Sequence, residues 1–290
     1  MGGAVKATDR RERLRAILTG ERCVMPASVH DPLSARLAQS LGFEAGMFAG
    51  SVASLMVLGA PDLAVITLTE FAEQARRITR ATDLPIIADA DHGYGNALSV
   101  ARTVEELEYA GVAALTIEDT ELPQAFGAKG ARVIPLAEGV GKMRAAVSAR
   151  DDAALIVVAR TGASSISGID DAVTRCKAYQ DTGVDALFLS GVESRDHLEK
   201  LCAVARVPVL LGAMAPDVRD LDYLSGLGVR VALQGHWPLR AAISAIRDTM
   251  TALKGNAAYA GSDTAASAAL MAELSHDAHY KKATKDFLND

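Results

Sequence analysis

Short, continuously apolar runs recur along this chain, and each is followed by a longer amphipathic stretch. The eight runs occupy residues 23–28, 45–50, 85–91, 114–119, 155–161, 186–191, 207–213 and 230–235. Continuous hydrophobicity is typical of parallel strands that are covered on both faces, whereas a half-solvated strand alternates. Eight strands alternating with helices therefore predict an α/β fold, a (β/α)8 barrel of the TIM type.

The stretches between the runs carry helix start signals. Asp31 followed by Pro32 predicts a helix start, and Thr103 with Glu106 three residues later predicts a capping box. We also expect an N-terminal helix at about 8–18 that closes the barrel floor. Residues 255–290 are predicted to form a C-terminal helical extension of a single domain, 1–290. The alternative, a doubly wound sheet, is disfavoured because no GxGxxG turn follows the first strand.

Composition excludes several classes of function. A net charge of −6 with 4% aromatic residues gives no reason to expect a nucleic-acid partner. No apolar run is long enough to span a bilayer, and the charged N-terminus lacks the apolar core of a signal peptide. The three cysteines show no CxxC spacing. We therefore expect a cytoplasmic protein without a membrane partner.

Polar residues gather where the predicted strands end, which in this fold is the end that carries the chemistry. The segment "IIADADHGYG" (86–95) ends an apolar run on two aspartates. In chain order the strand-end residues are Ser51, Asp89, Asp91, Glu118, Asp119, Arg160 and His236. Carboxylates without a Cys or His cluster favour a hard cation, Mg²⁺ or Mn²⁺, bound by one or two protein oxygens and by waters. Asp89 is the predicted direct ligand, with Asp91 and Glu118 acting through water.

Each of these residues also has a structural interpretation. The acids could cap helices or pair with Arg160, and Arg160 could instead clamp a substrate carboxylate with its guanidinium fork. Gly50 and Ser51 allow backbone N–H groups to approach an anion, although Gly-Ser after a strand is often only a turn. His236 is either a buried structural histidine or, placed opposite the acids, a hydrogen-bond donor or proton carrier.

The motifs "FAGSVAS", "DADHGYGNA", "GVAALTIEDT" and "IVVART" resemble those of the isocitrate lyase/phosphoenolpyruvate mutase superfamily over essentially the whole chain. His92, which follows the second aspartate, and the pair Gly235-His236 resemble the oxaloacetate decarboxylase branch. The resemblance implies a (β/α)8 barrel that binds Mg²⁺ and an α-keto acid at its mouth. It also implies a homotetramer, a dimer of dimers that swap a C-terminal helix.

Carried over residue by residue, the resemblance implies the decarboxylation of oxaloacetate to pyruvate and CO2 through a metal-stabilised enolate. Ser51, with Gly50, would bind the pyruvyl carboxylate, and Arg160 and His236 would contact the α-keto diacid substrate and act in catalysis. Asp62 and His92 are expected in the outer shell of the site.

This chain departs from the superfamily's pattern in four places. The loop 120–133 lacks the cysteine of the superfamily's carbon–carbon lyases, and the sixth strand ends on Ser190 instead of the histidine of the mutase branch. Met214 stands where a related decarboxylase has tyrosine, and Gly162 is smaller than the polar residue expected there. Two alternatives therefore stay open. One is a lyase or hydrolase for another 2-keto or 2-hydroxy diacid, such as a 2-alkylmalate or phosphonopyruvate. The other is a barrel that binds α-keto acids without turnover. No predicted strand end carries a lysine, which argues against Schiff-base chemistry.

Overall fold

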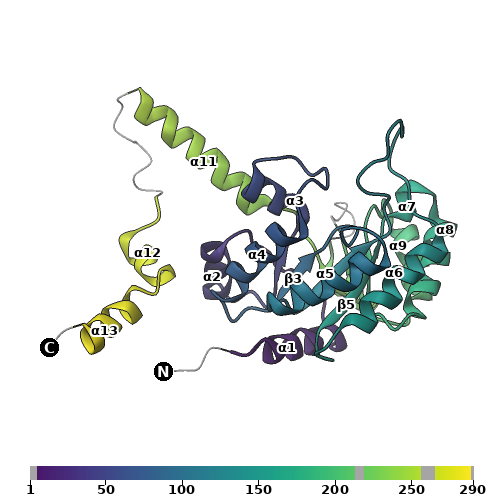
Figure 1. Ribbon diagram of the computed structural model, residues 1–290, viewed down its shortest axis with the longest axis horizontal. Helices are drawn as coiled ribbons and strands as arrows, with labels where there is room; N and C mark the ends of the chain where they lie inside the picture. The colour runs from purple at the N-terminus through teal and green to yellow at the C-terminus, as the bar shows by residue number, and fades with distance from the viewer. Residues whose placement is uncertain (1–4, 213–218, 256–264, 289–290) are drawn as a thin grey trace. The chain divides into compact units, whose positions relative to one another are not determined.

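The computed structural model describes residues 5–212, 219–255 and 265–288 (Figure 1). It divides into two compact units, Met1–His236 and Trp237–Asp290, and each is described by itself. Met214 lies outside the described residues.

Eight parallel strands form the sheet of the first unit, and each pairs with the next one in the sequence. They are β1 (Ala27–Ser28), β2 (Gly46–Phe48), β3 (Ile86–Asp89), β4 (Ala114–Glu118), β5 (Ile156–Thr161), β6 (Ala186–Leu189), β7 (Val209–Leu211) and β8 (Val229–Ala232). A parallel bridge between Val24 and Val231 joins the last strand to the segment that leads into the first. The predicted TIM-type barrel is confirmed, and every strand lies within two residues of a predicted apolar run.

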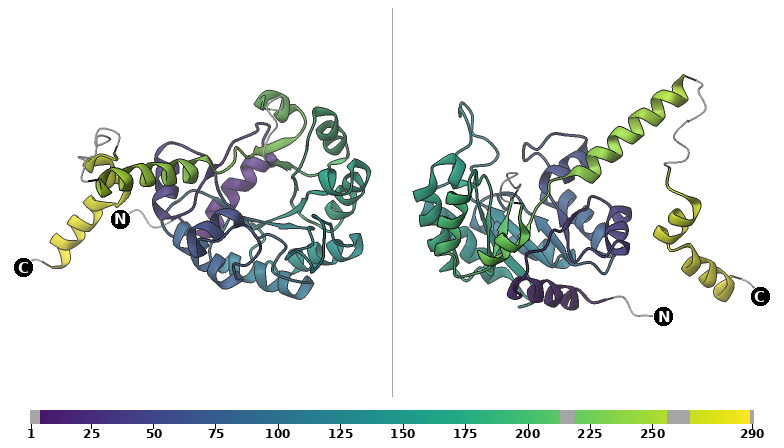
Figure 2. Two further views of the ribbon diagram at one scale, coloured as in Figure 1. Left: turned by 90° about the horizontal axis from the view of Figure 1, so that it is seen from above. Right: turned by 180° about the vertical axis from the view of Figure 1, so that it is seen from behind.

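Helices cover the outside of this sheet, as the view from above shows (Figure 2, left). In the first unit they are α1 (Ala7–Thr19), α2 (Pro32–Ser40), α3 (Gly50–Ala53), α4 (Leu68–Thr79), α5 (Ala97–Tyr109), α6 (Leu136–Ala149), α7 (Ala163–Ile166), α8 (Ile169–Gln180), α9 (Arg195–Val204) and α10 (Leu221–Gly226). A π-helical turn, η1 (Ser54–Leu58), follows α3. The apolar layer between strands and helices is continuous, which explains why the strands have no polar face.

Helix α1 closes one end of the barrel, as predicted. Leu14 and Leu18 are buried among side chains from the barrel interior. The guanidinium of Arg11 donates hydrogen bonds to the backbone oxygens of Val112 (3.1 Å) and Glu108 (2.8 Å) at the amino end of β4. This end of the barrel is therefore a sealed floor, and the opposite end is the one open to ligands.

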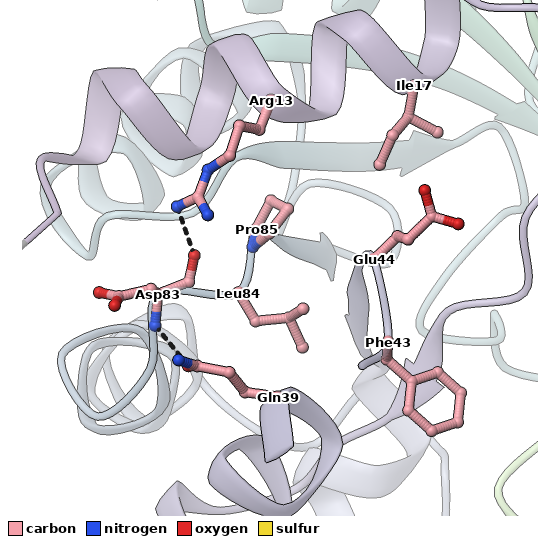
Figure 3. A pocket seen from close by; sticks show the side chains of 8 residues that line it. All are labelled: Arg13, Ile17, Gln39, Phe43, Glu44, Asp83, Leu84 and Pro85. Carbon is pink, nitrogen blue, oxygen red and sulfur yellow. Dashed lines mark hydrogen bonds between the residues drawn. The ribbon is translucent and has the colours of Figure 1, made fainter. Parts of the chain in front are cut away.

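A small cavity of about 340 Å³ lies beside this floor (Figure 3). Arg13 Nη2 donates to the backbone oxygen of Asp83 (2.6 Å), and the Asp83 N–H donates to Gln39 Oε1 (2.8 Å). These bonds tie α1 and α2 to the segment that leads into β3. The Asp83 carboxylate takes no part in them, so the polar groups here serve the connection between elements.

One predicted helix start is wrong. Helix α5 begins six residues before Thr103, with the side chain of Asn96 accepting hydrogen bonds from the N–H groups of Leu98 and Ser99. Thr103 lies inside the helix, fully buried, and its hydroxyl donates to the backbone oxygens of Gly93 and Ser99. A threonine inside a helix can donate its hydroxyl proton to a backbone oxygen of the preceding turn. With a glutamate three residues later, it shows the same T-x-x-E spacing as a true capping box.

The second unit consists of α11 (Trp237–Lys254), α12 (Ala268–Leu274) and α13 (Asp277–Phe287). Helices were predicted in this region, and the exchange of a helix between subunits stays a prediction. In the described part of the chain, no helix combines the length and the apolar character that crossing a membrane requires.

Candidate functional site

A cavity of about 690 Å³ lies at the carboxyl ends of the strands. Its wall contains seven of the predicted site residues: Ser51, Asp62, Asp89, Asp91, Glu118, Arg160 and His236. Gly50 and His92 do not line it, and both lie directly behind its acidic side. These seven residues come from the ends of five strands, β2, β3, β4, β5 and β8, and thus share one space.

The turn after β3 is built to aim its second aspartate back at the cavity. Asp91 has a positive φ of 46°, a conformation that Asp tolerates better than most residues. Its backbone oxygen accepts from the N–H of Glu118 (2.8 Å), which fixes the turn against the end of β4. His92 then points into the protein, where its ring lies 5.9 Å from that of Tyr94. Burial lowers the pKa of His92 to about 4, so it is neutral at physiological pH.

Asp89, Glu118 and Arg160 form an ion cluster. Arg160 Nη1 donates to Asp89 Oδ2 (2.6 Å), and its Nε lies 3.1 Å from Glu118 Oε2. The guanidinium also lies over the ring of Phe188, 5.2 Å from its centroid. Asp89 Oδ1 accepts from the hydroxyl of Thr116 (2.8 Å). Arg160 is therefore an ion-pair partner of both acids, as its structural interpretation required. Its contact with a substrate stays a prediction.

Asp91 is a buried acid without a hydrogen-bond or ion-pair partner among the described residues. It is 6% exposed, and no group in the described residues donates a hydrogen bond to its carboxylate. Burial raises its pKa to about 8, and the negative charges of Asp89, Asp62 and Glu118 add to the shift. The Cβ of an alanine at Gly50 would lie 2.3 Å from Asp91 Oδ1, so only glycine leaves room for this carboxylate. A buried carboxylate among like charges fits a bound cation.

The described residues contain no group of three His, Cys, Asp or Glu side chains placed to ligate one ion directly. This agrees with Mg²⁺, which keeps several waters and typically uses one or two carboxylates. The oxygens of Asp89 each keep a lone pair beyond the hydrogen bonds that they accept, so a direct contact with an ion is compatible with the ion cluster. The donor set therefore fits a hydrated hard cation.

His236 follows β8 and has one hydrogen-bond partner in the described residues. Its Nδ1 lies 2.8 Å from the hydroxyl of Ser28, at the end of β1. Burial lowers the pKa of His236, an effect that the charges of Asp89 and Asp62 oppose. The sequence analysis missed Ser28 and Thr116, because a single hydroxyl residue in a strand shows no pattern. Ser28 could have been identified from the predicted closure of the barrel, because closure makes β1 and β8 neighbours.

Asp119 lies behind the cavity wall and is fully buried. Its Oδ2 accepts hydrogen bonds from the hydroxyls of Thr161 (3.0 Å) and Tyr179 (2.7 Å) and from Arg175 Nη1 (3.1 Å). These residues lie on β5 and α8, so the carboxylate joins three elements. Asp119 was identified as a strand-end acid, but no sequence pattern connects it with Arg175, 56 residues further along the chain.

Comparison with known proteins agrees with this geometry. Residues 14–254 match the family model described as phosphoenolpyruvate phosphomutase. The chain is 53% identical over 279 residues to the oxaloacetate decarboxylase of Bradyrhizobium sp. (strain BTAi1), which covers 96% of this chain and 97% of that protein. It is 56% identical over 250 residues to the oxaloacetate decarboxylase of Rhodopseudomonas palustris (strain BisA53), covering 86% of each.

Solved structures show the same fold over nearly the whole chain. Oxaloacetate acetylhydrolase in complex with 3,3-difluorooxalacetate superposes with a TM-score of 0.87 at 27% identity, covering 99% of both chains. Phosphonopyruvate hydrolase in complex with oxalate and Mg²⁺ has a TM-score of 0.86 at 27% identity, covering 97% of this chain and 99% of the other. The chain thus belongs to the phosphoenolpyruvate phosphomutase family, within the isocitrate lyase/phosphoenolpyruvate mutase superfamily.

Proposed function

We propose that this protein is a carboxy-lyase that decarboxylates oxaloacetate to pyruvate and CO2 in the presence of Mg²⁺. The observation that carries the proposal is the identity of 53% over nearly the full length to a protein named oxaloacetate decarboxylase. The shared cavity supports it, because acids, one arginine and one histidine meet at the open end of the barrel. The loop 120–133 contains no cysteine, which argues against the carbon–carbon lyases.

Asp89 would hold the ion directly, and Asp91 and Glu118 would hold its waters. Bound Mg²⁺ would supply a Lewis acid for the negative charge that develops as CO2 leaves. Asp62 lines the same cavity and would accept hydrogen bonds from the surrounding water. His92, neutral and buried behind Asp91, would pack the turn that carries the two aspartates.

The remaining residues would bind and orient the substrate. The backbone N–H groups at Gly50 and Ser51 begin α3 and suit a carboxylate at a helix start. Arg160 would donate hydrogen bonds to the substrate as well as to the acids, because a guanidinium carries five N–H donors. His236 would orient the carboxylate that leaves or protonate the enolate of pyruvate at its methylene carbon.

Product analysis tests this proposal. Purified protein is incubated with oxaloacetate and Mg²⁺, and pyruvate is measured by a coupled dehydrogenase assay against a metal-only blank. We expect pyruvate above the blank, loss of the signal with EDTA, and its return with excess Mg²⁺. Asp89→Ala should abolish this activity with the fold retained, whereas Asp83→Ala at the floor cavity is the matched control. Retained activity in Asp89→Ala would remove Asp89 from the site.

The same incubation separates the alternatives. Oxalate and acetate in place of pyruvate would identify a hydrolase, the activity named for one structural neighbour. Turnover of a 2-alkylmalate or of phosphonopyruvate, with oxaloacetate untouched, would identify another superfamily reaction. Mg²⁺-dependent binding of oxalate without any turnover would identify a binding protein. The homotetramer and the cytoplasmic location stay predictions from the sequence.

A further inference from the structure

Ser28 and His236 come from opposite ends of the chain and meet at the mouth of the barrel. Ser28 ends β1, and His236 follows β8 by four residues. Pairing of Val24 with Val231 brings the two segments together. Ser28 Oγ lies 2.8 Å from Nδ1 of the imidazole, a short hydrogen bond. The bond leaves Nε2 as the ring nitrogen available to a molecule in the cavity.

The serine hydroxyl is free to adapt to either form of the ring. In the described residues it has no other hydrogen-bond partner, and a hydroxyl can donate or accept by rotation. Burial lowers the pKa of His236, so the neutral ring predominates at neutral pH and carries a single proton. The chemistry of the cavity therefore decides which nitrogen holds that proton.

The charges in the cavity favour a proton on Nε2. Asp62 and Asp89 line the same cavity, and both act electrostatically on the ring. A lone pair on Nε2 would face these carboxylates and an anionic substrate, which is repulsive. An N–H at the same place faces them with a positive dipole. Nδ1 is then the acceptor, and the hydroxyl of Ser28 is the donor.

We propose that Ser28 is a positioning residue that donates to Nδ1 of His236 and so holds the ring with Nε2–H directed at the substrate. This inference rests on the proposed function, because it names the residue that prepares His236 for a dicarboxylate. Binding a leaving carboxylate and protonating an enolate both require the proton on Nε2, so one device serves either role of His236.

Nitrogen NMR of the histidine rings tests the assignment directly. The chain has six histidines, and comparison with His236→Gln assigns the two ring nitrogens of His236 in ¹⁵N-histidine-labelled protein. We expect a protonated Nε2 and an unprotonated, hydrogen-bonded Nδ1 in the wild type, and in Ser28→Ala an Nδ1 resonance shifted by the loss of that hydrogen bond. A protonated Nδ1 in the wild type, or an unchanged spectrum in Ser28→Ala, would overturn the assignment.

Kinetics give the second readout. Ser28→Ala should lower kcat about five- to tenfold, the effect of one lost neutral hydrogen bond, with a smaller change in KM. Ser28→Thr, which keeps the hydroxyl, should restore most of kcat. Ser225→Ala is the matched control, because Ser225 accepts a hydrogen bond from the N–H of Cys23 (2.8 Å), in the segment that leads into β1. An equal loss of kcat in both alanine variants would overturn the positioning role.

The NMR and the kinetics can fail separately. A wild-type protein that produces no pyruvate but has an Nε2–H ring whose Nδ1 hydrogen bond is lost in Ser28→Ala would refute the proposed function and support the role of Ser28. A protein that decarboxylates oxaloacetate but has an unchanged Nδ1 resonance in Ser28→Ala would do the reverse.

Discussion

The Asp119 carboxylate offers a sharp test of how helix α8 supports the cavity. Glu118 and Arg160 are paired directly across β4 and β5, and the next residue along each strand, Asp119 and Thr161, is joined by a side-chain hydrogen bond. Tyr179 donates the shortest of the three hydrogen bonds to Asp119, at 2.7 Å. Removing that hydroxyl should loosen the strand ends that hold the ion cluster.

Tyr179→Phe makes this change with little disturbance of packing. The tyrosine is fully buried, and its hydroxyl occupies space left by Gly139, where a Cβ would lie only 2.3 Å away. Phenylalanine therefore fits without a clash. A hydrogen bond to a charged group contributes roughly 1.5–3 kcal/mol. For a unit of this size, a loss of ~2 kcal/mol lowers Tm by about 4–8 °C.

Activity should also fall in Tyr179→Phe. Asp119 keeps its hydrogen bonds from Arg175 and Thr161 but loses the third, so it holds the neighbouring strand ends less firmly. We expect kcat to drop roughly three- to tenfold, since small misplacements of catalytic groups are costly. Pyruvate formation is measured well below the Tm of both proteins. Circular dichroism checks that both are folded.

A second ion pair, which is half-buried, supplies the control. Arg150 Nη1 donates to Asp185 Oδ2 (2.6 Å) near the amino end of β5, at the floor of the barrel. Arg150→Met should lower Tm by a similar amount and leave kcat at the wild-type value. Equal kcat in Tyr179→Phe and the wild type, with the expected loss of Tm, would refute the link between α8 and the site.

Three further substitutions test the acidic side and the histidine. Gly50→Ala should abolish activity with the fold intact, because its Cβ would lie 2.3 Å from Asp91 Oδ1; wild-type turnover would show that the carboxylate can move aside. Asp91→Asn keeps the volume but cannot ionise, so calorimetry should show Mg²⁺ binding weakened at least about tenfold, the effect of one charge. Unchanged Mg²⁺ affinity would exclude Asp91 from the ion's surroundings. His236→Gln should reduce kcat more than it weakens Mg²⁺-dependent oxalate binding, and an unchanged rate would assign His236 a structural role only.

The barrel could be predicted from the sequence because its physics is repetitive. A strand covered on both faces must be apolar throughout, so each strand could be recognised from a single short apolar run. The closing helix could also be predicted, because Leu14 and Leu18 bury one side of an otherwise charged segment. The wrong start of α5 has a local cause: Asn96 and Thr103 both have side chains that bond to the backbone, and spacing alone does not say which one caps.

The acids could be placed in one cavity, because parallel strands bring their carboxyl ends together. Their partners could not be predicted. Whether Arg160 bonds to Asp89 depends on the lateral order of the strands and on side-chain conformation, which the sequence leaves open. Ser28 and Tyr179 act over 208 and 60 residues of chain, respectively, and neither carries a motif. Their roles follow from closure of the sheet and from the packing of α8.

Charge balance in the cavity links these observations to the proposed reaction. Four carboxyl groups in its described lining, those of Asp62, Asp89, Asp91 and Glu118, face one guanidinium, that of Arg160. Even with Asp91 protonated, the remaining charges sum to about −2, which would repel a dicarboxylate at short range. A divalent cation would cancel these two negative charges, so the substrate's negative groups could enter next to the acids. The arrangement is unfavourable for binding an anion alone and favourable for binding an anion together with a metal ion, and this is the requirement that Mg²⁺-dependent decarboxylation of oxaloacetate imposes.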